Sequence, residues 1–165
     1  MTDWYVQLAQ QWIQRDPDPS TREELQQLVD DGDADELSRR FAGRLAFGTA
    51  GLRGLLGAGP MRMNRLVVRE TTAGLADYVA RTAERASLRG IVIGFDGRRR
   101  SRDFAIEAAG VLAARGIPAH LFESITATPV VAWAVTRLRA AAGIMITASH
   151  NPPDYNGYKV YWENG

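Results

Sequence analysis

The stretch Ile91-Val92-Ile93-Gly94-Phe95, followed by Asp96-Gly97-Arg98, decides the fold class of this chain. Five apolar residues that end in a polar loop are typical of a buried strand, and the pattern of residues 101–115 predicts a helix directly after it. Strands that alternate with helices predict an α/β layered domain with a mixed, largely parallel sheet and helices on both faces. The remaining elements are expected at residues 117–122 (strand), 128–138 (helix, with Thr128 as N-cap), 142–147 (strand) and 158–161 (strand).

Residues 1–46 are predicted to form an N-terminal helical extension of this domain. Trp4, Leu8 and Trp12 recur at helical spacing, which favours one amphipathic helix. Ser20 and Glu23 have the spacing of a capping box and would open a second helix.

An acidic run, Asp31-Gly32-Asp33-Ala34-Asp35, has the alternating carboxylates of a magnesium loop. Its position between two predicted helices favours another role, because acidic side chains stabilise helix N-termini. We therefore interpret the run as a helix cap. Beyond it, the glycine-rich stretch 47–60 is predicted as a loop or irregular hairpin, and a long helix is expected from about residue 64 to residue 86.

The composition excludes several classes of function. The net charge of +1 gives no reason to expect nucleic acid or an anionic membrane as a partner. Because cysteine is absent, disulfides and thiolate metal sites are excluded. No signal peptide is visible at the N-terminus and no apolar run is long enough to span a bilayer, so a cytoplasmic protein is expected. Lys159 is the single lysine among 20 basic residues.

The segment Thr147-Ala148-Ser149-His150-Asn151-Pro152, with Asn156-Gly157-Tyr158-Lys159 after it, carries most of the chemistry. It leaves the end of a predicted strand, where α/β sheets place their sites. A serine hydrolase would require Gly-x-Ser-x-Gly and a distant histidine, but Ser149 lies between Ala148 and His150, so this class is disfavoured. A phosphorylated Ser149 fits better, since a phosphate needs amide and cationic groups around it.

Two arginines are candidates for binding a phosphate. Arg53 lies between glycines in Phe47-Gly48-Thr49-Ala50-Gly51-Leu52-Arg53-Gly54, and its guanidinium could bind phosphate with two hydrogen bonds. A surface salt bridge is the alternative. Arg98 lies in a strand-to-helix loop, a setting that favours anions. For Arg98 a structural ion pair is the alternative, and chemistry alone does not separate it from Arg99 and Arg100.

Together these motifs resemble the phosphoserine loop and the N-terminal signature of the phosphohexomutase (phosphoglucomutase/phosphomannomutase) superfamily. With residues 156–162, the signature is most similar to the phosphoglucomutase-2/phosphopentomutase-like branch. The resemblance implies that residues 47–165 are the first of the family's four domains. The chain ends directly after a predicted strand, so a truncated chain that lacks the later domains is expected.

The resemblance also implies an activity. Family members interconvert sugar 1-phosphates and 6-phosphates, or pentose 1- and 5-phosphates, through a phosphoserine and a sugar bisphosphate. Ser149 would be the phosphoserine and would bind Mg²⁺ through its phosphate, while the metal's carboxylate ligands are absent from this chain. His150 and Lys159 would be candidates for proton transfer, and Arg53 would stabilise the transferring phosphate. The residues implied to bind substrate or phosphate are Gly48, Thr49, Arg53, Arg98, Asn151 and Asn156.

The expected cofactors are Mg²⁺ and an activating sugar bisphosphate of the glucose 1,6-bisphosphate type. The expected partners are small phosphosugars and the remaining domains of the same polypeptide. The fragment alone is predicted to be inactive as a mutase. The alternative is a stand-alone, non-catalytic module that binds phosphosugars or phosphate.

Overall fold

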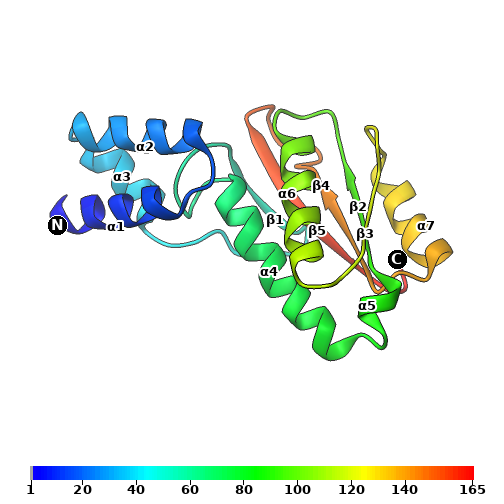
Figure 1. The fold of residues 1–165 in the computed structure, drawn as a ribbon. Helices are drawn as coiled ribbons and strands as arrows, with labels where there is room; N and C mark the ends of the chain where they lie inside the picture. The colour runs from blue at the N-terminus through cyan, green and yellow to red at the C-terminus, as the bar shows by residue number, and fades with distance from the viewer. Residues whose placement is uncertain (1) are drawn as a thin grey trace.

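The structure, a computed structural model, describes residues 2–165 and begins with a helical extension. This extension consists of α1 (Thr2–Arg15), α2 (Pro19–Asp30) and α3 (Ala34–Phe41), which pack together at one end of the molecule (Figure 1). Trp12 is buried and meets Phe41 edge to face at 6.2 Å between ring centroids, whereas Trp4 is exposed. The predicted helices of the extension are therefore confirmed, with only one of its two tryptophans in the core.

The helix caps of the extension agree in part with the prediction. Asp33 caps α3, because its Oδ1 accepts the backbone N–H of Glu36 at 3.0 Å. This bond confirms the interpretation of the acidic run as a helix cap. The predicted capping box at Ser20 is wrong, since Asp18 is the N-cap of α2 and accepts the N–H of Ser20 at 3.0 Å. Pro19, which sets the first helical φ, begins the helix two residues earlier than a cap at Ser20 would.

Five strands form one sheet within residues 2–165, in the order β1-β5-β4-β2-β3. The sheet is mixed, as predicted: β2 pairs in parallel with β3 and β4, whereas β5 runs antiparallel to both β4 and β1. The strands are β1 (Leu52–Leu55), β2 (Ile91–Phe95), β3 (Ala119–Leu121), β4 (Ala142–Ile146) and β5 (Tyr155–Trp162), and the helices among them are α4 (Arg65–Thr82), α5 (Ala86–Arg89), α6 (Ser101–Ala114) and α7 (Thr128–Leu138).

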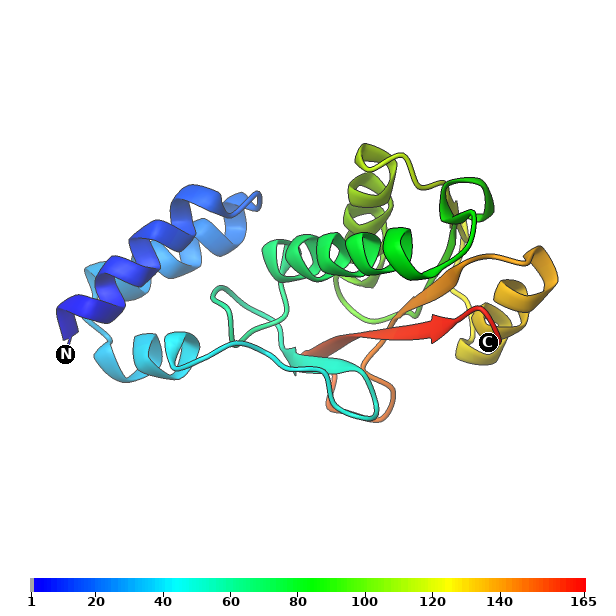
Figure 2. The ribbon, with the colours of Figure 1, turned by 90° about the horizontal axis from the view of Figure 1, so that it is seen from below.

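Helices cover both faces of the sheet (Figures 1 and 2). On one face Ile93 and Ile144 pack in the main core with Phe104 of α6 and residues of α4. On the other face α7 packs in a smaller cluster that includes Met145. Alternate residues of a strand point to opposite faces, so buried runs such as 91–95 serve both cores. The predicted α/β layered class is confirmed.

Three local predictions are wrong. The stretch 47–60 contains a true strand, β1, because Leu52 is buried and the segment pairs with β5. The long helix ends at Thr82, and a separate short helix, α5, follows it. Ala127, not Thr128, is the N-cap of α7 and has no capping side-chain hydrogen bond.

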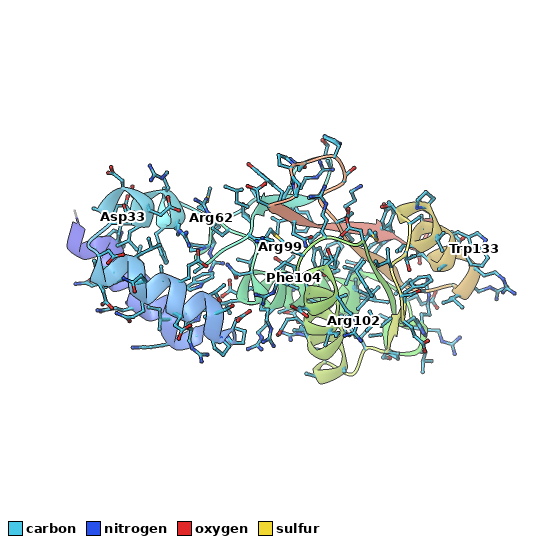
Figure 3. The ribbon with its side chains drawn as sticks, turned by 90° about the horizontal axis from the view of Figure 1, so that it is seen from above. Asp33, Arg62, Arg99, Arg102, Phe104 and Trp133 are labelled. Carbon is cyan, nitrogen blue, oxygen red and sulfur yellow. The ribbon has the colours of Figure 1, made fainter. Side chains whose placement is uncertain are left out.

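Ion pairs join the extension to the sheet. Arg100 bonds to Asp18, and Arg62, on the segment between β1 and α4, lies 3.0 Å from Glu36. Figure 3 shows Arg62 beside the extension. Burial opposes ionisation of Glu36, but hydrogen bonds from Arg39, Arg40 and Arg62 outweigh it and lower its pKa to about 2. The extension is therefore held by charge as well as by its apolar core.

A search of the described residues for a helix long and apolar enough to cross a membrane finds none.

Candidate active site

The site is built where β4 ends and β1 begins, because the last residue of β4, Ile146, and the first residue of β1, Leu52, both pair with Tyr158 of β5 between them. The loop from Thr147 to Asp154 leaves β4 there and lies beside β1 (Figure 2). The amide of Thr147 donates to the carbonyl of Gly157 at 3.1 Å, and Gly157 pairs on its other side with Arg53. Residues about a hundred positions apart in the sequence are thus aligned across three strands.

Ser149 has an exposed side chain and an unusual backbone. Its φ is 58°, in the left-handed region that costs a non-glycine residue about 1–3 kcal/mol. Its amide donates to Oγ1 of Thr147 at 2.9 Å, which fixes the turn. His150 is also exposed beside it. Such strain persists only where the surroundings hold it, and it concentrates at functional sites.

Arg53 reaches the same loop from β1. Its Nη1 donates to Oδ1 of Asn151 at 2.8 Å, so the structure brings these two predicted residues together. The Nε of Arg53 is buried and has no hydrogen-bond partner within residues 2–165. A buried donor of this kind is costly unless it is satisfied, so this N–H group is a polar group of the site that the described residues leave unpaired.

Lys159 projects from the same sheet face as Arg53. Arg53 pairs with Gly157, which lies two residues before Lys159 in β5, and side chains of a strand return to the same face at every second residue. With Gly48 and Thr49, Lys159 lines a cleft of about 310 Å³. Gly51 has a φ of 91°, and a Cβ there would lie 2.6 Å from the carbonyl oxygen of Tyr158, so only glycine lets this loop approach β5.

Arg98 has a different environment from the one expected for a phosphate ligand. Its two terminal nitrogens donate to four backbone carbonyls of the loop, those of Ser149, Asn151, Pro152 and Tyr155, at 2.7–3.1 Å. Its Nε lies 3.4 Å from Asp96. The ion pair that was the alternative is therefore present, together with a clamp on the loop that the sequence did not indicate.

Asn156 likewise contacts protein groups. It is fully buried, and its Nδ2 donates to the carbonyl of Arg99 and to Oγ of Ser101, both at 2.9 Å. Its Oδ1 accepts the N–H of Gly157 at 2.7 Å. Both amide hydrogens are used, so the structure places Asn156 as a support of β5 where phosphate binding was expected.

Two supporting residues were not identified from the sequence. Thr147 accepts the Ser149 amide, and Ser101 donates to Asp96 at 2.7 Å. The signal for Thr147 is its position two residues before Ser149, the spacing of a hydroxyl turn. Ser101 opens a helix directly after Asp96-Gly97-Arg98, where a hydroxyl often bonds to a neighbouring loop.

The described residues contain no group of three or more histidine, cysteine, aspartate or glutamate side chains placed to hold a metal ion. The exposed residues of the loop include Ser149, with its hydroxyl, and Asp154, with its carboxylate.

Comparison with known proteins identifies the family. Residues 44–165 match the family described as "Phosphoglucomutase/phosphomannomutase, alpha/beta/alpha domain I". The chain belongs to this family. A phosphoglucomutase/phosphomannomutase family protein from Burkholderia thailandensis has a similar structure, with a TM-score of 0.61 and 26% identity over 72% of this chain and 26% of that one.

Relatives of known name share more of the sequence. Mouse phosphopentomutase is 47% identical over 161 residues, which cover 94% of this chain and 26% of that protein. Human glucose 1,6-bisphosphate synthase is 43% identical over the same shares. Phosphoribomutase from Saccharomyces cerevisiae is 43% identical over 93% of this chain and 25% of that protein. The predicted branch is confirmed, and the chain spans about a quarter of the length of these relatives.

Proposed function

We propose that this chain is the phosphoserine-bearing first domain of a phosphosugar mutase, with residues 1–46 as a helical extension and residues 47–165 as the domain proper. The observation that supports this most is the exposed Ser149, held in a left-handed backbone conformation on a loop whose Asn151, two residues further on, accepts a hydrogen bond from Arg53. Such an arrangement presents a hydroxyl or its phosphate to a ligand while a cation lies nearby.

In the proposed reaction, a phosphate on Ser149 passes to a hydroxyl of the sugar phosphate. The bond between phosphorus and the Ser149 oxygen breaks, a bond to the sugar oxygen forms, and the sugar proton goes to a base. The released Ser149 oxygen takes up a proton and becomes the free hydroxyl. Lys159 and His150 are the candidates for this base, and Arg53 offsets charge on the phosphoryl oxygens. The return transfer from the other phosphate of the sugar bisphosphate restores phosphoserine and leaves the isomerised product.

Mg²⁺ fits the chemistry of the loop, because it prefers oxygen ligands and is usually bound by phosphates with one or two carboxylates. We propose that the phosphate on Ser149 supplies one of these ligands. Carboxylate ligands would come from the part of the enzyme that this chain does not span. The ion would neutralise charge on the phosphoryl group. Arg53 and the loop amides would position the phosphate.

We propose pentose or hexose monophosphates as substrates, with a glucose 1,6-bisphosphate type activator to phosphorylate Ser149. This rests on the names of relatives that are 43–47% identical to this chain: phosphopentomutase, phosphoribomutase and glucose 1,6-bisphosphate synthase. The 165 residues alone are expected to show no mutase turnover, because the relatives are about four times as long.

The test is phosphoryl uptake by the complete polypeptide that the native gene encodes. Incubation with glucose 1,6-bisphosphate labelled in its phosphates should place label on Ser149, and ribose 1-phosphate should be converted to ribose 5-phosphate. Ser149→Ala should abolish both. Conversion that persists in Ser149→Ala would reject the phosphoserine route. Phosphosugar binding without label on wild-type Ser149 would favour the non-catalytic module.

A further inference from the structure

One side chain, Arg98, directs both of its terminal nitrogens to backbone carbonyls of the candidate active-site loop and of Tyr155, the first residue of β5. A guanidinium has five N–H groups in a fixed planar fork. Four of them meet the carbonyls of Ser149, Asn151, Pro152 and Tyr155. The Nε lies 3.4 Å from the Asp96 carboxylate in an ion pair. Because the loop and the start of β5 occupy both terminal nitrogens, neither is free to bind a phosphate.

The bonds of Arg98 span the whole turn that contains Ser149. The carbonyl of Ser149 itself is bonded at 2.8 Å, directly after the left-handed φ of 58°. Hydrogen bonds from a charged donor are roughly twice as strong as neutral ones. The four bonds together hold the turn in a conformation that the sequence Ser-His-Asn-Pro would not adopt by preference.

Hydrogen bonds to Asp96 also hold the backbone of Arg98 in place. Its backbone N–H donates to Oδ1 of Asp96 at 3.0 Å, and the same oxygen accepts from Ser101 at 2.7 Å. Its side chain is 16% exposed. The guanidinium of Arg98 therefore extends from the loop between β2 and α6. The hydrogen bonds that hold this loop are separate from those of the Ser149 loop.

We propose that Arg98, oriented by Asp96, is a positioning residue that holds the Ser149 loop in the geometry needed for phosphoryl transfer. This inference rests on the proposed function and goes beyond it, because it assigns Arg98 to the loop backbone and excludes it from the substrate. Misplacement of a reacting group by about 1 Å can cost about 100-fold in rate. Loss of the clamp should therefore lower turnover while substrate binding is retained.

The test uses the complete polypeptide with three substitutions: Arg98→Ala, Arg98→Lys and, as matched control, Arg102→Ala. Arg102 is an exposed arginine at the start of α6 (Figure 3). Arg98→Ala should lower kcat by about 10- to 100-fold, the range seen when supporting residues are removed from a site, with KM for the sugar phosphate changed less than about threefold. Arg98→Lys should recover little, because an ammonium cannot bond four carbonyls in one plane. Arg102→Ala should match wild type.

Chemical rescue separates positioning from folding. Ethylguanidinium added to Arg98→Ala should restore part of its kcat. The same addition should leave the kcat of Arg102→Ala unchanged. A raised KM with unchanged kcat would overturn the proposal in favour of direct phosphate binding. Unchanged kinetics would also overturn it, as would a lower melting temperature with full kcat per folded molecule. If Ser149 of the wild-type protein takes up no label, the proposed function fails. If the wild-type protein is labelled, and Arg98→Ala shows the same label uptake and the same turnover, only the proposed role of Arg98 is refuted.

Discussion

Gly157 is the residue whose replacement should disturb the site most for the smallest chemical change. It lies in β5 between β1 and β4, opposite Arg53. A Cβ added there would lie 2.5 Å from the carbonyl oxygen of Leu52 and 2.7 Å from that of Thr147. Both atoms belong to the backbone, so no side chain can rotate away, and the strands themselves must separate.

The expected cost follows from these contacts. Overpacking a well-packed region typically costs about 1–3 kcal/mol, and two obstructing carbonyls place Gly157→Ala at the upper end, about 3 kcal/mol. In a chain of this size each kcal/mol shifts the melting temperature by about 2–4 °C, so a decrease of about 6–12 °C is expected. Separation would also weaken the 3.1 Å bond from the Thr147 amide to Gly157 and so disturb the Ser149 turn.

The assay is thermal unfolding followed by circular dichroism, with Gly110→Ala as the matched control. Gly110 is exposed in α6, and a Cβ there would meet nothing within 4 Å. That control should be stabilised by about 0.5–1 kcal/mol, because alanine favours a helix interior over glycine. A Gly157→Ala protein that melts within 2 °C of wild type, with normal label uptake on Ser149, would refute the reasoning.

The remaining predictions concern the second core, the extension and the phosphate site. Gly94→Ala should destabilise by about 1–3 kcal/mol, because its Cβ would lie 2.3 Å from Val131 of α7; an unchanged melting temperature would contradict this packing. Glu36, with its pKa lowered from 4.5 to about 2, stabilises the fold above pH 4.5, and this contribution is lost as the pH falls to about 2. Melting temperatures measured between these pH values should therefore fall more steeply for wild type than for Glu36→Gln, and parallel curves would count against the Arg–Glu36 cluster. Arg53→Ala should lower kcat about 100-fold in the mutase assay, whereas a change in KM alone would place Arg53 in ground-state binding.

The sequence predicted the layered fold well because its signals are local. The buried run 91–95 indicates a strand directly, whereas of the helix caps only Asp33 was predicted correctly. It failed at β1, whose four residues, Leu52 to Leu55, include an arginine and a glycine. That strand exists because β5 pairs with it from more than a hundred residues away, and no local pattern carries this information.

The sequence indicated which residues gather at the candidate site, but it did not indicate the hydrogen-bond partners of Arg98 and Asn156. Arg53 is hydrogen-bonded to Asn151 on the loop that carries Ser149, whereas the roles predicted for these residues stay predictions. Arg98 and Asn156 were predicted as phosphate ligands because arginine and asparagine in such loops often bind anions. The structure shows that their donors are directed to carbonyls and to Ser101. Residue type indicates what a side chain can bind, but only the tertiary arrangement decides which partner reaches it.

The central claim is that Ser149 carries the phosphoryl group that is transferred. Phosphosite mapping with intact mass measurement, on the protein purified from its native host, tests this most directly. The account predicts a single phosphoryl group on Ser149 that disappears on incubation with excess sugar monophosphate and returns with a sugar bisphosphate. Unmodified Ser149 that stays unmodified with the bisphosphate present, or a stable phosphate on another residue, would contradict it.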